Sequence, residues 1–267
     1  KNLLDVSGMS DHLVPIAPRA ATIEEVQRYH PPEYVQRMKD LSDAGGGDAG
    51  ELTPFGAGGF EIALLAAGGT LTAIEKTLDG TVDTAYALVR PPGHHAQADI
   101  GRGFCMFSNA ALGAFHARQA LGLDRVAVVD WDVHHGNGTQ DIFYEDGGVL
   151  FFDTHQHPLY PGTGLAHEIG RGAGEGFTIN CPFPAGAGRD EVVRAFREKL
   201  VPAADAFRPE LVIVSAGFDS RIDDPLGAFR LTDDDFAELT GIVRGIAERH
   251  CGGRLVASLE GGYALAG

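Results

Sequence analysis

Apolar runs of strand length alternate with helical patterns along most of this 267-residue chain. Such alternation is typical of parallel strands whose connecting helices cover both faces of one sheet. The sequence therefore predicts a single α/β domain with a mostly parallel sheet. The expected strands are residues 84–89, 125–129, 149–152, 177–180, 211–215 and 254–258. The expected helices are residues 22–29, 32–41, 60–78, 108–121, 190–207 and 232–250, the first with Thr22 and Glu25 as a capping box.

Two glycine-rich stretches interrupt this pattern. Residues 43–50 (DAGGGDAG) are expected to form a flexible loop, and residues 166–176 a second loop. Neither stretch has the length or composition of a linker that would divide the domain.

Four of the expected strands run directly into a polar cluster. The clusters are RPPGHH at 90–95, DWDVHH at 130–135, GFDS at 217–220 and EGGY at 260–263. In parallel sheets, ligands bind beyond the carboxyl ends of the strands. We therefore expect the four clusters to form one functional site.

The second cluster indicates a metal site. In an extended chain, side chains two residues apart point the same way, so Asp130, Asp132 and His134 would leave a strand end together. Asp and His suit a divalent metal, and a further carboxylate can support a ligand. Asp219 of the third cluster can supply another ligand, although an aspartate after a strand can also cap a helix. His135 faces the opposite way by alternation and is expected to be structural.

The first cluster offers two adjacent imidazoles. His94 and His95 follow a rigid Pro-Pro-Gly turn that can present both to the metal site. One can act as general base to an activated water and as general acid to a leaving amine, while the other stays paired with a carboxylate. Asp130 and Asn137 are candidates to hydrogen-bond one imidazole each.

The fourth cluster contributes a phenol. Tyr263 follows two glycines, so its hydroxyl is free to reach the metal and hold a developing oxyanion. No Gly-x-Ser-x-Gly elbow, phosphate-binding loop or Gly-x-Gly-x-x-Gly turn follows a strand. Serine hydrolases and nucleotide-dependent enzymes are therefore disfavoured.

Charge and cysteine content narrow the partners further. The net charge of −16 disfavours a surface for nucleic acid or anionic membrane. Three isolated cysteines indicate neither disulfides nor a cysteine zinc site, and a reducing, cytoplasmic location is expected. No uninterrupted apolar stretch of about 18 residues is present, and the N-terminus lacks a signal pattern. The chain starts at Lys1 without Met and stops four residues after Tyr263, so the domain is expected to be incomplete at both termini. Monomer and homo-oligomer both remain open.

Together these residues resemble the zinc-dependent histone deacetylase family, in its class II-like bacterial branch that includes acetylpolyamine amidohydrolases. Asn137, after His-His-Gly, resembles class II, because class I usually has Asp there. The matching stretches are RPPGHHA (90–96), GFCMFSNAALGA (103–114), VDWDVHHGNGTQDIFY (129–144), YPGTG (160–164), SAGFDSRIDDPLG (215–227) and LEGGYA (259–264).

The resemblance implies an arginase-like fold and a single deacetylase catalytic domain over residues 1–267. It implies one Zn²⁺ on Asp132, His134 and Asp219 and a water-driven hydrolysis that removes acetyl or other acyl groups from acyl-lysine or a related alkylamine. It also implies that His95 is the general base and acid, that His94 is an electrostatic partner oriented by Asp130, and that Tyr263 polarises the acyl carbonyl. Gly103, Phe104 and Tyr160 would line a narrow channel. The resemblance further implies a structural K⁺ near Asp130, with Asp153 at a position where the family has a Ser-type residue.

Two departures from the family bear on the substrate. The family often has a carboxylate on a loop at the channel rim, and residues 53–59 offer none. Polyamine-selective members can carry an acidic gate where this chain has Leu226, which favours acyl-lysine or an apolar acyl group. Three alternatives stay open: an acetylpolyamine deacetylase, an arginase-like enzyme with two metals, and a non-catalytic acyl-lysine binder. The two-metal alternative is disfavoured because His135 and Gly136 occupy the positions where its further ligands are needed.

Overall fold

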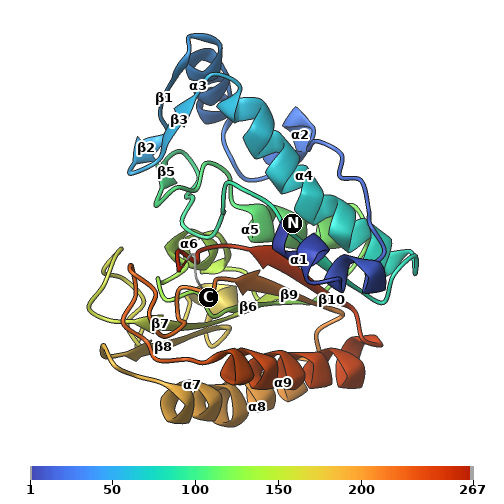
Figure 1. Cartoon of the computed structure of the whole chain (residues 1–267), viewed down its shortest axis with the longest axis vertical. Helices are drawn as coiled ribbons and strands as arrows, with labels where there is room; N and C mark the ends of the chain where they lie inside the picture. The colour runs from blue at the N-terminus through green and yellow to red at the C-terminus, as the bar shows by residue number, and fades with distance from the viewer. Residues whose placement is uncertain (1, 265–267) are drawn as a thin grey trace.

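Six parallel strands form the central sheet of this computed structural model, which describes residues 2–264 (Figure 1). All six expected strands are confirmed, with ends shifted by up to four residues. Their order across the sheet is β4-β10-β9-β6-β7-β8, and every neighbouring pair is parallel. The bounds are Thr84–Ala87 (β4), Val126–Asp130 (β6), Val149–Gln156 (β7), Thr178–Phe183 (β8), Leu211–Ala216 (β9) and Leu255–Leu259 (β10).

Helices cover both faces of the sheet, as the alternating pattern predicts (Figure 1). On one face, α4 and α5 bury alanine and isoleucine side chains against β6, β7 and β9. On the other face, α9 and the helical segment before β9 bury a larger cluster around Trp131, Phe152 and Phe196. The bounds are Gly59–Leu78 (α4), Asn109–Gln119 (α5), Arg189–Ala195 (α7), Phe196–Leu200 (η3), Val201–Phe207 (α8) and Asp233–Cys251 (α9).

Two expected helices differ from the structure. The helix expected at 22–29 is confirmed only over Ile23–Val26 (α2), after which the chain turns towards Pro31, although its capping box is present. The helix expected at 190–207 contains a wider turn, η3, in which the N–H of Val201 bonds to the carbonyl of Phe196. Pro202 has no N–H and cannot continue the regular bonding pattern, which accounts for the change of pitch.

The expectation of a flexible loop at 43–50 is wrong. Gly46–Asp48 (β1) pairs antiparallel with Pro54–Gly56 (β3), and Gly50–Glu51 (β2) pairs parallel with Gly101–Arg102 (β5). These pairings join segments far apart in the sequence, so local composition did not reveal them. Asn137–Phe143 (α6) was also not expected, because its polar start resembles a loop. The remaining bounds are Asn2–Val6 (α1), Met9–His12 (η1), Pro32–Asp43 (α3) and Gly172–Gly174 (η2).

The carboxyl ends of the central strands bring polar side chains together. Asp130 at the end of β6 lies opposite Ser215 of β9 and Asp153 of β7 in the strand register, and all three are fully buried. Within residues 2–264, no helix is both long and apolar enough to cross a membrane.

The segment before α2 is attached to α4 by a charged network. Arg19 donates to both oxygens of Glu25 at 2.7 Å and to Glu75 at 2.6 Å. Glu25 is 9% exposed and also accepts the N–H of Thr22. The hydrogen bonds from Arg19 lower the pKa of Glu25 from 4.5 to about 2.

We predict that Glu25→Gln lowers the free energy of unfolding by about 1–3 kcal/mol near neutral pH, the usual range for a hydrogen bond to a charged group. Because the folded-state pKa of Glu25 is lowered, the stabilisation is present above about pH 4.5 and is lost as the pH falls towards 2. Urea unfolding of both proteins at about pH 7 and about pH 3 tests this, since the difference should shrink at the lower pH. An equal difference at both pH values would contradict the assignment.

Candidate metal centre and active site

Asp132, His134 and Asp219 meet at the ends of the adjacent strands β6 and β9. The Nδ1 atom of His134 lies 3.1 Å from Asp132 Oδ1 and 3.1 Å from Asp219 Oδ2. Their ligand atoms lie within 4.8 Å of one another, and both carboxylates are fully buried. Asp219 does not cap a helix, because α9 begins only at Asp233.

The backbone brings these groups together by turns, which corrects the expected strand alternation. The strand ends at Asp130, whose Oδ1 accepts the N–H of Asp132, and Asp132 Oδ1 in turn accepts the N–H of His134. Asp219 Oδ1 accepts the N–H of Val133 at 2.8 Å. An aspartate carboxylate readily accepts the N–H two residues later, so these residues bend the chain instead of extending it.

The electrostatics of this cluster favour a divalent cation. Burial and the charge of the neighbouring Asp132 carboxylate together raise the pKa of Asp219 to about 7, although its contacts with His134 act in the opposite direction. Burial alone would lower the pKa of His134, but its hydrogen bonds to Asp132 and Asp219 raise it to about 10. Two buried carboxylates within 4.8 Å of each other repel unless a positive charge lies between them.

The two histidines of the first cluster lie beside this site with different partners. His94 Nδ1 is 2.9 Å from Asp130 Oδ2, and His95 Nδ1 is 2.8 Å from Asn137 Oδ1. Burial would lower the pKa of His94, but the charges of Asp130 and Asp132 together raise it well above 6.5. Burial and then the charge of His94 lower the pKa of His95. The neighbouring imidazoles are therefore biased towards different protonation states, His94 charged and His95 neutral.

His135 lies outside this group. Its ring nitrogens contact Thr163 Oγ1 at 2.8 Å and Gln140 Oε1 at 3.0 Å, and the residue is 1% exposed. These contacts join the turn after β6 to α6 and to the loop that contains Thr163, which is a structural role.

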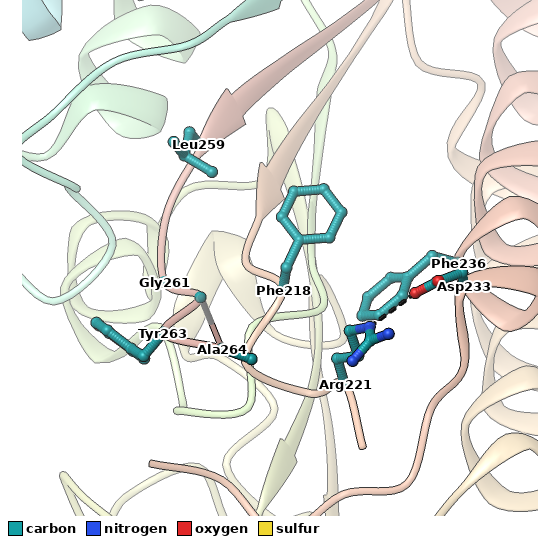
Figure 2. Close-up of a pocket in the computed structure, with 9 residues that line it drawn as sticks. Phe218, Arg221, Asp233, Phe236, Leu259, Gly261, Tyr263 and Ala264 are labelled. Atoms are coloured by element: carbon teal, nitrogen blue, oxygen red, sulfur yellow. Dashed lines mark hydrogen bonds and ion pairs between the residues drawn. The ribbon is translucent and has the colours of Figure 1, made fainter. Parts of the chain in front are cut away.

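Tyr263 reaches the site from the loop after β10. Its N–H donates to Asp224 Oδ2 at 2.7 Å, and its ring meets Phe104 edge-on with a centroid distance of 6.2 Å. Burial raises the pKa of Tyr263, so its hydroxyl stays protonated and can donate. Figure 2 shows Tyr263 pointing away from Phe236. Both residues border a cavity of about 440 Å³ beside the same loop.

The residues expected to line a channel lie next to the histidines. The Tyr160 ring meets His95 edge-on at a centroid distance of 5.1 Å. A Cβ at Gly103 would lie 2.4 Å from His95 Cδ2 and 3.0 Å from Tyr160, so no larger residue fits there. Phe104 is 44% exposed and Leu226 is 45% exposed, so both side chains are accessible from solvent.

Sequence reasoning missed a carboxylate beside these wall residues. Gly103 and Phe104 donate their N–H groups to the carbonyls of Glu51 and Leu52, which places β2 beside these two residues. Glu51 forms an ion pair with Arg102. Glu51 lies just before the stretch 53–59, and only the pairing of β2 with β5 brings it next to Gly103.

Asp224 and Glu260 were also not expected as site residues. Asp224 accepts the N–H groups of Tyr263, Ala264 and Leu226, and thereby joins the loop after β9 to the tyrosine. Glu260 accepts N–H groups from the histidine turn. The only sequence signal for either is its place directly beside the motifs already identified.

A second buried acidic pair lies beneath the histidines. Asp153 accepts the N–H of Gly136 at 2.8 Å and contacts His155 Nδ1 at 2.7 Å, while Asp130 contacts His94. The buried hydroxyl of Ser215, opposite Asp130, has no hydrogen-bond partner among residues 2–264.

With this geometry established, comparisons with known proteins define the class. The Histone deacetylase domain family matches residues 1–267. The "Histone deacetylase-like amidohydrolase" of Pseudomonas aeruginosa is 46% identical over 267 residues, which are 100% of this chain and 70% of that protein. The human "Polyamine deacetylase HDAC10" is 42% identical over 270 residues, covering 97% of this chain and 40% of that protein.

A solved structure agrees with these relatives. The crystal structure of the HDA15 HD domain superposes with a TM-score of 0.93 at 39% identity, covering 98% of this chain and 74% of that one. The fold is thus the arginase/deacetylase fold, and the chain belongs to the histone deacetylase family. It is a deacetylase-type enzyme that hydrolyses amide bonds.

We predict that Gly261→Ala weakens metal binding by at least about 10–100-fold, the usual effect of disturbing groups that support metal ligands. A Cβ at position 261 would lie 2.2 Å from Asp219 Oδ2 and 2.7 Å from Asp132 Oδ2, so both ligands would have to move. Calorimetric titration of metal-stripped protein with Zn²⁺ measures the change. Gly241→Ala is the control, because a Cβ there meets no atom within 4 Å. Unchanged affinity in Gly261→Ala would contradict the prediction.

Proposed function

We propose that this enzyme is a zinc-dependent amidohydrolase that removes acetyl or other acyl groups from the amine of acyl-lysine or a related alkylamine. The observation that carries the proposal is the convergence of a buried Asp-His-Asp ligand set, two differently paired imidazoles and a protonated phenol at one sheet edge. Residues 1–267 would belong to one catalytic domain.

Asp132, His134 and Asp219 fit Zn²⁺, because carboxylate and imidazole ligands from three residues leave a position open for reactants. When bound, Zn²⁺ would polarise the acyl carbonyl and lower the pKa of the attacking water. A divalent cation would also relieve the repulsion between the two buried carboxylates, which supports the fit independently of the relatives.

His95 is the proposed general base and acid. Its pKa is lowered by burial and by His94, so the ring is neutral and can take a proton from water through Nε2, since Nδ1 faces Asn137. It can then return the proton to the leaving amine. His94, held by Asp130, would remain charged and stabilise negative charge that develops on the substrate.

Tyr263 would donate its hydroxyl proton as a hydrogen bond to the acyl oxygen while that oxygen becomes negative. The raised pKa of Tyr263 keeps this proton on the phenol. Gly103, Phe104 and Tyr160 would enclose the alkyl chain of the substrate and exclude water from the reacting bond.

The likeness to a polyamine deacetylase makes acetylpolyamines the second candidate substrate class. We favour acyl-lysine, because Leu226 can contact the aliphatic part of lysine but cannot pair with a second amine. The net charge of −16 acts in the other direction, since a diffuse acidic surface attracts polycations.

A structural cation such as K⁺ is proposed near Asp130 and Asp153. Two buried carboxylates from adjacent strands supply oxygen ligands of the kind that hard cations prefer, as does the Ser215 hydroxyl, which has no hydrogen-bond partner among the described residues. Its role would be to hold Asp130 in place behind His94.

Tyr263→Phe should lower kcat by about 10²–10³-fold, the usual loss for one oxyanion donor. Zinc content and hydroxamate affinity should change little, because both depend mainly on the metal ligands. Asp132→Ala is the matched comparison and should lose both zinc and turnover. Steady-state kinetics on acetyl-lysine peptides, with zinc measured by mass spectrometry, test both variants. A Tyr263→Phe enzyme with wild-type kcat would show that the phenol has no role in the mechanism. Two tightly bound Mn²⁺ per chain in the wild-type enzyme would favour the arginase-like alternative.

Leu226→Glu should shift the ratio of kcat/KM values towards acetylspermidine and away from acetyl-lysine peptides. A carboxylate at the opening can pair with the second amine, whereas leucine offers only apolar contact worth about 0.8 kcal/mol per buried methylene. Leu226→Gln, which adds polarity without charge, is the control. Measurements at low and high salt separate a specific pair from diffuse attraction, which is screened beyond about 8 Å at physiological ionic strength. A wild-type preference for acetylpolyamines that persists at high salt would refute the proposed substrate class.

A further inference from the structure

Glu260 is a buried carboxylate with an unusual pair of partners. It follows β10, is 5% exposed, and its Oε2 accepts the N–H of Gly93 at 2.6 Å and the N–H of His94 at 3.2 Å. These two N–H groups belong to the turn that carries the imidazole pair, and 166–167 residues separate them from Glu260 in the sequence. One oxygen atom therefore holds the backbone of the histidine turn.

The residues after Glu260 hold the other parts of the site. The N–H of Gly261 donates to Asp132 Oδ2 at 2.8 Å, and the Gly261 carbonyl accepts the N–H of Phe218, next to Asp219, at 2.9 Å. Figure 2 shows Gly261 and Tyr263 on this loop and Phe218 on the neighbouring loop after β9. Four consecutive residues, 260–263, thus contact the histidine turn, a metal ligand and the loop of a second ligand, and they end in the phenol.

The hydrogen bonds to Glu260 fix the distance between the turn that carries His94 and His95 and the proposed metal ligands. His94 Nε2 lies 3.8 Å from Asp132 Oδ2, and the His94 and His95 ring centroids are 4.0 Å apart, so a small movement of the turn displaces both imidazoles. Charge-assisted bonds to a carboxylate are shorter and stronger than those between neutral groups. Without Glu260, two buried N–H groups would lose their acceptor, and the turn would move to find another.

We propose that Glu260 is a positioning residue for the reaction, which holds His94 and His95 at the correct distance from the metal ligands through the N–H groups of Gly93 and His94. This inference rests on the proposed function only where a lowered kcat for deacetylation is used as evidence. The positioning itself is a statement about the histidine turn and can be measured without turnover.

Three substitutions separate the hydrogen bonds from the charge. Glu260→Gln keeps an oxygen that can accept both N–H groups, and Oε1, which the amide nitrogen would replace, has no partner among residues 2–264. Glu260→Ala removes the acceptor. Glu260→Asp keeps the charge on a side chain one methylene shorter. Glu25→Ala is the matched control, because Glu25 is also a buried carboxylate that accepts a backbone N–H, and it lies in the Arg19 network at the start of α2.

The zinc-loaded enzymes are compared on an acetyl-lysine peptide. We expect Glu260→Ala to lower kcat by about 10²-fold, the effect of a small misplacement of reacting groups, with KM and zinc content unchanged. Glu260→Gln should stay within about threefold of the wild-type kcat, and Glu25→Ala should lose stability but keep kcat. A Glu260→Ala kcat equal to wild type, or an equal loss of kcat in Glu260→Gln and Glu260→Ala, would overturn the proposal. If Glu260→Ala does not fold, a wild-type kcat in Glu260→Asp would overturn it and a lowered kcat would support it.

Proton NMR provides the readout that does not need turnover. The N–H between His94 Nδ1 and Asp130 gives a downfield resonance, assigned by its loss in His94→Ala. We expect this resonance to shift or broaden in Glu260→Ala and to stay in place in Glu260→Gln and Glu25→Ala. An unmoved resonance in Glu260→Ala would overturn the positioning role even if the wild-type enzyme hydrolyses no acyl-lysine substrate, an outcome that would refute only the proposed function.

Discussion

Five carboxylates buried at one edge of the sheet determine how the loops around them are arranged. Asp130, Asp132, Asp153 and Asp219 are fully buried and Glu260 is nearly so. A buried carboxylate is tolerated only when hydrogen bonds or opposite charges replace its lost hydration. Here backbone N–H groups and imidazoles do so, and most of these bonds also fix a loop.

The functional geometry follows from this requirement. Asp132 accepts N–H groups from His134 and Gly261, and Asp219 accepts that of Val133, so satisfying the carboxylates also joins the loops after β6, β9 and β10. A small residue is needed where the loops meet, since a Cβ at Gly261 would collide with both ligands. The buried carboxylates create a strong preference for positive charge at one point, which is the proposed metal site.

Much of the fold was accessible from the sequence because strand-helix alternation is a local pattern. The six strands and the long helices α4 and α9 follow from apolar periodicity. The failures have a common cause. The pairing of residues 46–48 and 50–51 and the wide turn η3 depend on distant partners or on one proline, and periodicity does not report these.

For the site, the sequence alone determined which groups gather at the carboxyl edge, because parallel strands must end on the same side and each motif follows a strand. From this pattern Asp132, His134, Asp219, the two histidines of the 94–95 pair and Tyr263 are predicted to be neighbours. Only the tertiary structure decided how they are held. The turns at Asp130 and Asp132 bring the first ligands together. The pairing of the Glu51 segment with Gly103 and the hydrogen bonds from the histidine turn to Glu260 are contacts between remote segments. Their geometry depends on packing across the sheet, which no local pattern in the sequence encodes.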